Sequence, residues 1–316
     1  GVCGAPCADH MRRMSGSHSA DSMDIFDRRL VRRHRDRAAP HLADHDFLIR
    51  EVADRLGDRL DDVRREFPTA LDLGCHTGQV ANAVAGRAGI QTLLQCDLSE
   101  SMIRRAGGLR LAADEEALPF GPATLDLVVS CLGLHWVNDL PGTLLQIREA
   151  LRPDGLMLAA MLGGDTLFEL RQALFQAETE ATGGVSPRVS PMADLRDAAG
   201  LLQRAGFALP VADLDTITVS YGDPFTLMRD LRGMGQANAV RARHRAPMRR
   251  EILLRAASVL QERFADHEGR IGITFQIVWL MAWAPHAAQP KPLRRGSAAI
   301  RLADALGVGK PESEPH

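Results

Sequence analysis

The sequence predicts an α/β fold built on a seven-stranded, mostly parallel β-sheet with helices on both faces. Short β-like runs alternate with helical stretches between residues 70 and 161, and this alternation is typical of βαβ units. The runs are almost continuously apolar, as in Leu125–Cys131, which is expected of strands that helices cover on both sides. A glycine-containing turn follows the first run, at Leu71–Gly78, and also favours this fold class.

The expected elements follow in chain order. Residues 25–66 have a charged, helical pattern that Pro40 divides into two helices. Strands are expected at Ala70–Leu73, Thr92–Cys96, Arg110–Ala112, Leu125–Cys131, Leu156–Met161, Val211–Ser220 and Ile271–Trp283. Helices are expected to begin at Gly78, Ser99 and Leu140, to span Thr166–Thr182, and to end at Arg204.

The chain is expected to form one domain with two tails. The domain covers residues 24–284 and begins with N-terminal helices over residues 24–66. Residues 223–266 form a helical insertion between the last two strands, and their apolar side chains around two glycines suit a lid over the substrate mouth. We expect residues 1–23 to be a disordered tail and residues 285–316 to be loosely ordered.

Composition excludes several classes of function. The net charge of −2 argues against nucleic-acid binding, which usually shows as a basic excess. The apolar runs are too short for a transmembrane segment. Five cysteines, an odd number, favour free buried thiols. We predict no metal site, since Cys3 and Cys7 lack a second pair. His34, His41 and His45, with Asp44 or Asp46 nearby, could share a helical face, but Pro40 interrupts that helix.

The turn at Leu71–Gly78 predicts the cofactor. Glycines at Gly74 and Gly78 let the backbone approach a ligand, and the helix that follows offers unpaired N–H groups. Asp72, at the end of the strand, repels a pyrophosphate but can hold the ammonium of a methionine. The turn therefore favours S-adenosylmethionine (SAM) over NAD.

Acidic residues at the ends of the second and third strands also favour SAM. Asp97 can accept both ribose hydroxyls, although it could instead cap the helix after Ser99. Asp114 and Glu115 can accept the adenine amino group. Acidic residues at the ends of three successive strands predict a class I SAM-dependent methyltransferase fold. The expected cofactor-binding residues are Asp72, Gly74, Cys75, Gly78, Asp97, Leu98, Met102, Asp114, Glu115, Cys131 and Trp136.

The sequence also resembles a known family. Pro119-Phe120, Leu125–Ser130 and Leu151–Gly155 resemble the common small-molecule methyltransferase domain. Other motifs give a more specific resemblance, to the mitochondrial complex I assembly factor 5 family and its α-proteobacterial relatives. These motifs are Ile25–Arg28, Leu134–Pro141, Gly163–Arg171, Ala177–Glu180, Ser190-Pro191, Asp230–Gly235 and Arg295–Ala298. This resemblance covers nearly the whole chain from residue 24 to residue 300.

The resemblance implies an activity, a partner and a location. That family is associated with hydroxylation of an arginine on the iron–sulfur subunit of complex I, near the quinone site. The partner would be that subunit, and peripheral membrane association is compatible with such a target. The location would be the cytoplasm in a bacterium, or the matrix side of the inner membrane in a eukaryote.

Two residues are candidates for the chemistry. His135, where the fourth strand opens onto the substrate, is the candidate general base, or else caps a loop beside Trp136. Asp165 either caps the next helix or is, as Glu169 could be instead, the residue that binds a guanidinium of the substrate. His76 stands where glycine is commonest, so its side chain must turn away from the cofactor or the turn must change.

Two other functions stay open at this point. One is an O-methyltransferase acting on an acyl-carrier-bound or small-molecule substrate, of the biotin-pathway malonyl-carrier type, for which Arg232–Gly235 offers a similar element. A basic patch at the mouth would favour this enzyme, and arginines 28, 29, 32, 33, 35 and 37 could supply one. The other is an assembly chaperone that uses SAM only as a structural ligand.

Overall fold

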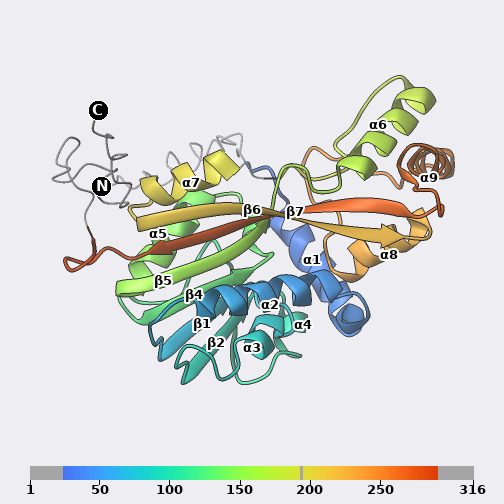
Figure 1. Ribbon diagram of the computed structural model, residues 1–316. Helices are drawn as coiled ribbons and strands as arrows, with labels where there is room; N and C mark the ends of the chain where they lie inside the picture. Colours follow the sequence, from blue (N-terminus) through green and yellow to red (C-terminus); the bar gives the residue numbers. More distant parts are fainter. Residues whose placement is uncertain (1–23, 193–194, 291–316) are drawn as a thin grey trace, which may run out of the picture.

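A seven-stranded sheet forms the centre of the computed structural model, which describes residues 24–192 and 195–290 (Figure 1). The strand order is β3-β2-β1-β4-β5-β7-β6. The strands are β1 (Thr69–Leu73), β2 (Thr92–Asp97), β3 (Leu109–Ala112), β4 (Leu125–Cys131), β5 (Leu151–Leu162), β6 (Ala208–Tyr221) and β7 (Ile271–Trp283). The first five are parallel, and β7 is antiparallel to both β5 and β6. The predicted fold class is therefore confirmed.

Helices cover both faces of this sheet. They are α1 (Arg28–Ala38), α2 (Phe47–Asp61), α3 (Gln79–Ala83), α4 (Glu100–Ile103), α5 (Leu140–Ala150), α6 (Phe168–Thr182), α7 (Leu195–Arg204), α8 (Pro224–Gly233) and α9 (Arg250–Phe264). Two short 3-10 helices, η1 (Ala39–Asp44) and η2 (Leu134–Trp136), complete the set among the described residues. The core on one face joins α2, α3, α6, α8 and α9, and the core on the other joins α5 and α7.

Side-chain alternation along the central strand explains these two cores. In β4, Leu127 and Val129 belong to the core on the α2 face, and Val128 belongs to the core on the α5 face. All three side chains are buried, which accounts for the continuous apolar run in the sequence.

The insertion between the last two strands lies at one end of the molecule. β6 and β7 form a long antiparallel ribbon, and α6, α8 and α9 pack around its far end (Figure 1). Phe168 of α6 meets Phe264 of α9 edge to face, with ring centroids 5.9 Å apart. The helical insertion expected between the last two strands is confirmed, because α8 and α9 lie between β6 and β7 in the chain.

Several boundaries differ from those expected, each for a local reason. Pro40 ends the α-helical geometry, and the chain continues as η1. α6 begins at Phe168 because Leu167 has a left-handed φ of +58°. β5 begins five residues early, at Leu151, which pairs with Leu125 before a bulge. The tail expected at residues 1–23 lies outside the described residues, and so does the tail expected at 285–316 except for residues 285–290.

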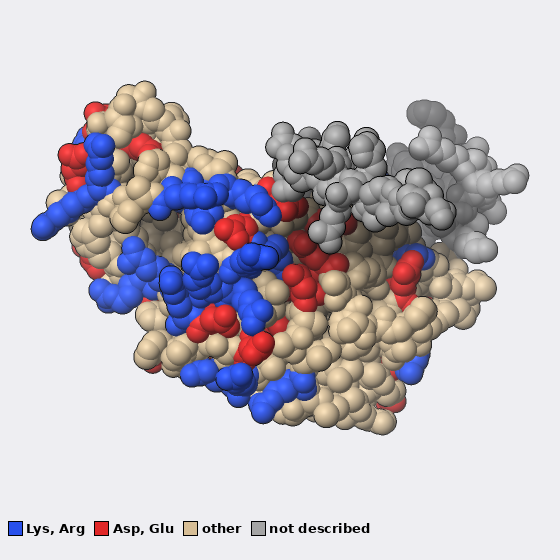
Figure 2. All heavy atoms as spheres, turned by 180° about the vertical axis from the view of Figure 1, so that it is seen from behind, with Lys and Arg blue, Asp and Glu red and all other residues tan. Residues whose placement is uncertain are grey.

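Basic side chains gather on one face of the molecule (Figure 2). α1 and the segment after α8 lie side by side, joined by a bridge between Phe26 and Val240. Both segments carry exposed arginines, namely Arg29, Arg32, Arg33, Arg37, Arg241 and Arg245. Within residues 24–192 and 195–290, every helix is too short or too polar to span a bilayer.

Candidate functional site

The turn between β1 and α3 lies at the carboxyl edge of the sheet, where β1 runs between β2 and β4. Gly74 has a φ of +74° and Gly78 a φ of +101°, and both values favour glycine. A Cβ on Gly74 would lie 3.4 Å from the Cα of Gly133, so the turn approaches the end of β4 closely. The backbone N–H groups of Gly74 and Cys75 both donate to the carbonyl of Cys96, in β2. Neighbouring strands thus fix the turn on both sides.

Asp72 is a fully buried carboxylate whose two oxygen atoms accept no hydrogen bond from any described residue. Burial raises its pKa well above the usual range, and the nearby Asp97 carboxylate raises it further. A buried acceptor without a donor costs free energy. The ammonium group of a methionine supplies both a donor and a positive charge, so Asp72 fits the role predicted for it.

His76 shows one of the two expected changes, an altered turn, while the turning of its ring away from the cofactor stays a prediction. Its backbone has a left-handed φ of +52°, and its buried ring turns towards β4, with Nε2 3.1 Å from the carbonyl oxygen of Cys131. Since a carbonyl only accepts, Nε2 carries the proton, and Nδ1 is an acceptor that no described residue reaches. Burial lowers the pKa of His76, and the charge of Arg35 adds to the effect.

Asp97 ends β2 and is fully buried. Its Oδ1 accepts the backbone N–H of Ser99 at 2.8 Å, and its Oδ2 accepts that of His76 at 3.1 Å. The alternative in which Asp97 caps α4 is wrong, because the cap is Ser99, whose Oγ accepts the N–H of Met102. Met102 is buried, and Leu98 packs against the apolar cluster that contains Trp136.

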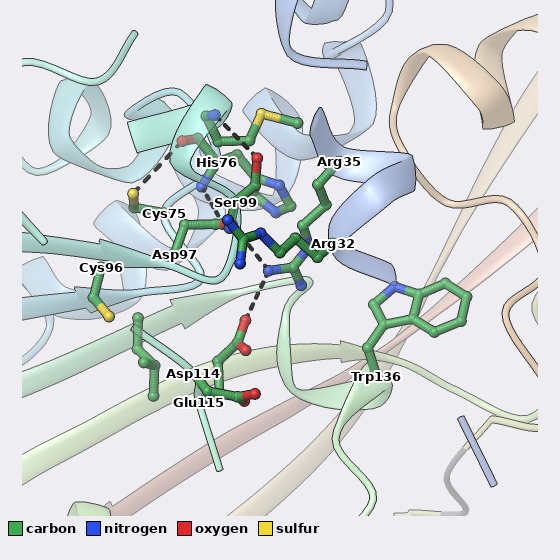
Figure 3. A network of polar contacts seen from close by, with 12 residues as sticks. Arg32, Arg35, Cys75, His76, Cys96, Asp97, Ser99, Asp114, Glu115 and Trp136 are labelled. Atoms are coloured by element: carbon green, nitrogen blue, oxygen red, sulfur yellow. Dashed lines mark hydrogen bonds and ion pairs between the residues drawn. The ribbon is translucent and has the colours of Figure 1, made fainter. Parts of the chain in front are cut away.

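Two arginines of α1 contact the carboxylates at the ends of β2 and β3. Nη1 of Arg35 lies 2.7 Å from Oε1 of Glu115 and 3.2 Å from Oδ1 of Asp97 (Figure 3). Arg28 pairs with Asp114 and with the second oxygen of Glu115. Burial alone would raise the pKa of Glu115, but Arg35 and Arg28 outweigh it and lower the pKa to about 2. The structure therefore brings together the residues predicted to bind adenosine, namely Asp97, Asp114 and Glu115. Two arginines that we did not predict lie between them.

Gln236, in the segment after α8, joins the insertion to the end of β4. Its Oε1 accepts a hydrogen bond from Nε1 of Trp136 at 2.7 Å and lies 3.1 Å from Nε2 of His135. Trp136 also meets Phe26 edge to face, with ring centroids 5.3 Å apart. A single glutamine in a loop carries no sequence pattern. Its position directly after the Gly233–Gly235 element was the one available signal.

His135 is a buried, neutral histidine. With the glutamine oxygen as acceptor, Nε2 of His135 carries the proton, and Nδ1 is an acceptor without a described partner. Burial lowers the pKa of His135 to about 3, despite the opposing hydrogen bond to Gln236. So weak a base is suited to accept a hydrogen bond from a substrate rather than to remove its proton near pH 7.

Comparisons with known proteins agree with this geometry. A model of the methyltransferase domain matches residues 71–159. A Danio rerio protein named arginine-hydroxylase NDUFAF5, mitochondrial, is 40% identical over 303 residues, which cover 94% of each chain. The Homo sapiens protein of that name is 43% identical over 296 residues, covering 92% of this chain and 85% of its own.

The chain belongs to the family of these arginine hydroxylases. It is an enzyme of the SAM-dependent methyltransferase superfamily, and SAM is the cofactor expected in its site. A Methylovorus malonyl-acyl-carrier protein O-methyltransferase is 33% identical over 284 residues, covering 85% of this chain and 93% of its own. The YcgJ protein of Bacillus subtilis, 13% identical, shares the fold with a TM-score of 0.52 over 73% of this chain and 98% of its own.

Asp165 and Glu169, the other residues considered for the chemistry of this family member, contact β7. Nε2 of Gln276 donates to Asp165 at 2.9 Å, and the buried Glu169 accepts the backbone and side chain of Thr274. The N-cap residue of α6 is Leu167, so the expected capping role of Asp165 is wrong. Asp165 is exposed, and no hydrogen bond or ion pair among the described residues joins it to the cofactor turn. Its role as a guanidinium ligand stays a prediction.

The three described cysteines are buried free thiols, as expected. Burial raises the pKa of Cys75 and Cys131 above the usual range, and that of Cys96 to about 12. Cys75 and Cys131 therefore stay protonated thiols, and their contact with the cofactor stays a prediction. The histidines considered as metal ligands diverge, since His34 bonds the carbonyl of Ala237 and His45 bonds Asp230. Among the described residues, no group of three acidic, His or Cys side chains is placed to hold a metal ion.

An apolar pocket of about 430 Å³ leads from the surface towards Gln236. α6, α8, α9 and the segments around residues 188–192 and 236–248 line it, and its apolar residues are Leu167, Leu170, Leu174, Val189, Met192, Met228, Leu231, Ala237, Pro247, Met248 and Leu253. A smaller inner cavity shares four residues with it, including Gln236, and reaches Leu132 at the end of β4. Residues of the helical insertion thus line this pocket, and their role as a lid stays a prediction.

Proposed function

We propose that this enzyme modifies an arginine of the iron–sulfur subunit of complex I, near the quinone site, by hydroxylation during assembly of the complex. The arginine of the iron–sulfur subunit is proposed as the target because the sequence motifs resemble those of the assembly factor family. Hydroxylation is proposed as the reaction because the relatives are named arginine hydroxylases. Relatives of that name from four vertebrates are 40–43% identical to this chain, whereas the malonyl-carrier O-methyltransferases are 33–36% identical. The higher identity favours the arginine as substrate.

The main structural support for the proposal is the apolar pocket, because Gln236 lines both this pocket and the smaller cavity beside it. An arginine side chain has an apolar stem and a guanidinium that only donates hydrogen bonds. The apolar walls suit the stem. Beyond Gln236, Nδ1 of His135 is a buried acceptor without a described partner, and it suits the guanidinium. Two arginines line the pocket, but neither opposes a cation strongly, because Glu178 pairs with Arg188 at 2.5 Å and Arg232 is exposed to solvent.

The described residues also suit the cofactor. Asp72 would hold the ammonium group, Asp97 the ribose hydroxyls, and Asp114 or Glu115 the adenine amino group. Bound SAM supplies an electrophilic methyl group to a methyltransferase, which needs only a nucleophile in line with it. Hydroxylation instead adds an oxygen atom and requires an oxidant, so the mass of the product distinguishes the two reactions.

The basic face supports a place for the enzyme on an anionic surface. Arg29, Arg33 and Arg37 are exposed on α1, but Arg28 and Arg35, which were expected to join them, point into the cofactor site. We propose peripheral association with a membrane that holds complex I. The side would be cytoplasmic in a bacterium and the matrix in a mitochondrion.

Mass spectrometry of the iron–sulfur subunit from a deletion strain tests the proposed function. We expect its arginine to lack the added oxygen in the deletion strain and to regain it when the wild-type gene is restored. An arginine that keeps the oxygen in the deletion strain would overturn the proposal. A missing methyl group would identify methyl transfer, and biotin auxotrophy would identify the carrier-protein enzyme. Complex I that fails to assemble although its arginine is normally modified would identify the chaperone.

A further inference from the structure

Arg28 and Arg35 lie on one face of α1, seven positions and so about two helical turns apart. Both reach Glu115, because Arg35 contacts its Oε1 and Arg28 its Oε2. Arg35, Asp97 and Glu115 are each at most 2% exposed in their side chains. These charges are therefore removed from water and depend on one another for stabilisation.

The same carboxylates are those that adenosine needs. The ribose hydroxyls and the adenine amino group are hydrogen-bond donors, and so is every N–H of a guanidinium. Oδ1 of Asp97 already accepts Ser99 and Arg35, and both oxygens of Glu115 already accept arginines. Figure 3 shows the Arg35 guanidinium between Asp97 and Glu115. The cofactor and the arginines thus compete for the same acceptors.

We propose that α1 is a gate for the cofactor, which Arg35 and Arg28 close by occupying the carboxylates of the adenosine subsite. SAM enters when α1 withdraws these two arginines. The affinity measured for SAM is then the intrinsic affinity multiplied by the fraction of molecules in which the gate is open. The gate requires only that SAM binds at this site, so it holds whichever reaction the enzyme catalyses and whichever substrate it modifies.

The gate is connected to the substrate pocket. The N–H of Asp27, which caps α1, donates to the carbonyl of Ala239 at 2.8 Å, and His34 of α1 bonds the carbonyl of Ala237 at 3.1 Å. Ala237 and Ala239 lie one and three positions after Gln236, which holds His135 and Trp136. Withdrawal of α1 therefore pulls on the segment that ends the pocket, and cofactor entry is coupled to the shape of the substrate site.

Calorimetric titration with SAM tests the gate. Replacing Arg35→Met keeps the apolar stem and removes the donor, so we expect the variant to bind SAM about tenfold or more tightly than the wild type. Arg33→Met is the matched control, because Arg33 is exposed on the same helix, and we expect its affinity to be unchanged. An affinity of Arg35→Met that equals or falls below that of the wild type would overturn the gate.

A second measurement does not depend on the folding of a variant. Stopped-flow tryptophan fluorescence of the wild type, in which Trp136 packs on Phe26 beside α1, follows SAM binding directly. We expect the observed rate to reach a plateau at high SAM concentration, set by the opening of the gate. A rate that rises in proportion to SAM concentration, without a plateau, would contradict the proposal.

Discussion

The side chain of Gln236 accepts the indole N–H of Trp136 at 2.7 Å, and this bond ties the insertion to the cofactor edge of the sheet. The two residues lie 100 positions apart in the chain. The same oxygen lies 3.1 Å from Nε2 of His135 and thereby fixes the ring so that Nδ1 is the free acceptor. One glutamine thus sets both the position of the pocket's inner end and the tautomer of the histidine beyond it.

Replacing Gln236→Leu should destabilise the protein by roughly 1–3 kcal/mol, because two buried N–H groups lose their acceptor. Urea unfolding followed by circular dichroism measures this difference. Gln203→Leu, at an exposed position on α7, is the control and should unfold like the wild type. Equal midpoints for wild type and Gln236→Leu would show that water or another group satisfies the indole.

Replacing Asp72→Asn should separate stability from cofactor binding. Above pH 3.8 an unfolded Asp72 loses its proton, whereas the raised pKa lets the folded one keep it, so this group makes the protein less stable as the pH rises. The neutral amide removes this dependence, and unfolding at pH 7 should require as much urea as for the wild type or more. Calorimetry should show SAM binding weakened by about tenfold or more, since the ammonium loses its counter-charge.

The control for this variant is Asp62→Asn, an exposed aspartate just after α2. It should change neither the unfolding midpoint nor the affinity for SAM. If Asp72→Asn bound SAM as well as the wild type does, the ammonium would have to be held by another residue.

Filling the pocket should block the substrate without affecting the cofactor. Met228 lines the pocket on α8, and Met228→Trp should reduce the modified fraction of the target arginine in a restored deletion strain by at least about tenfold. SAM affinity should stay unchanged. Phe225→Trp lies on the same helix, 40% exposed and outside the pocket lining, and should support normal modification. A fully modified arginine with Met228→Trp would place the substrate elsewhere.

The strands and the cofactor turn could be predicted because their signals are local. Leu125–Cys131 and Ile271–Trp283 are strands over the whole predicted lengths, since the first is a bounded apolar run that is buried on both sides and the second begins with alternating buried and half-buried residues. Asp72 and Asp97 could be placed because strand ends in a parallel sheet share one edge.

The arginines of α1 could not be predicted in the same way. Arg28 and Arg35 belong to a run of basic residues, and such a run usually lies on a solvated face. Their partners, Asp114 and Glu115, are about 80 positions away, so no local pattern connects the two sets. The spacing of seven residues, which places both arginines on one side of a helix, was the only signal.

The low pKa of His135 predicts how stability depends on pH. The pKa is about 3 in the folded protein and near 6.5 in the unfolded chain, so between these values the unfolded state binds a proton that the folded state does not. Stability must therefore fall as the pH drops below 6.5, by up to ~1.4 kcal/mol per pH unit for this one group.

The variant His135→Gln tests this dependence. Glutamine cannot take up the proton, yet its amide can still donate to Gln236, so the stability of the variant should fall less steeply than that of the wild type between pH 6.5 and 5. His267→Gln, whose side chain is 89% exposed, should follow the wild type. Parallel curves for the wild type and His135→Gln, measured by urea unfolding across this range, would mean that the ring becomes charged in place and that a base near neutral pH is available at the site after all.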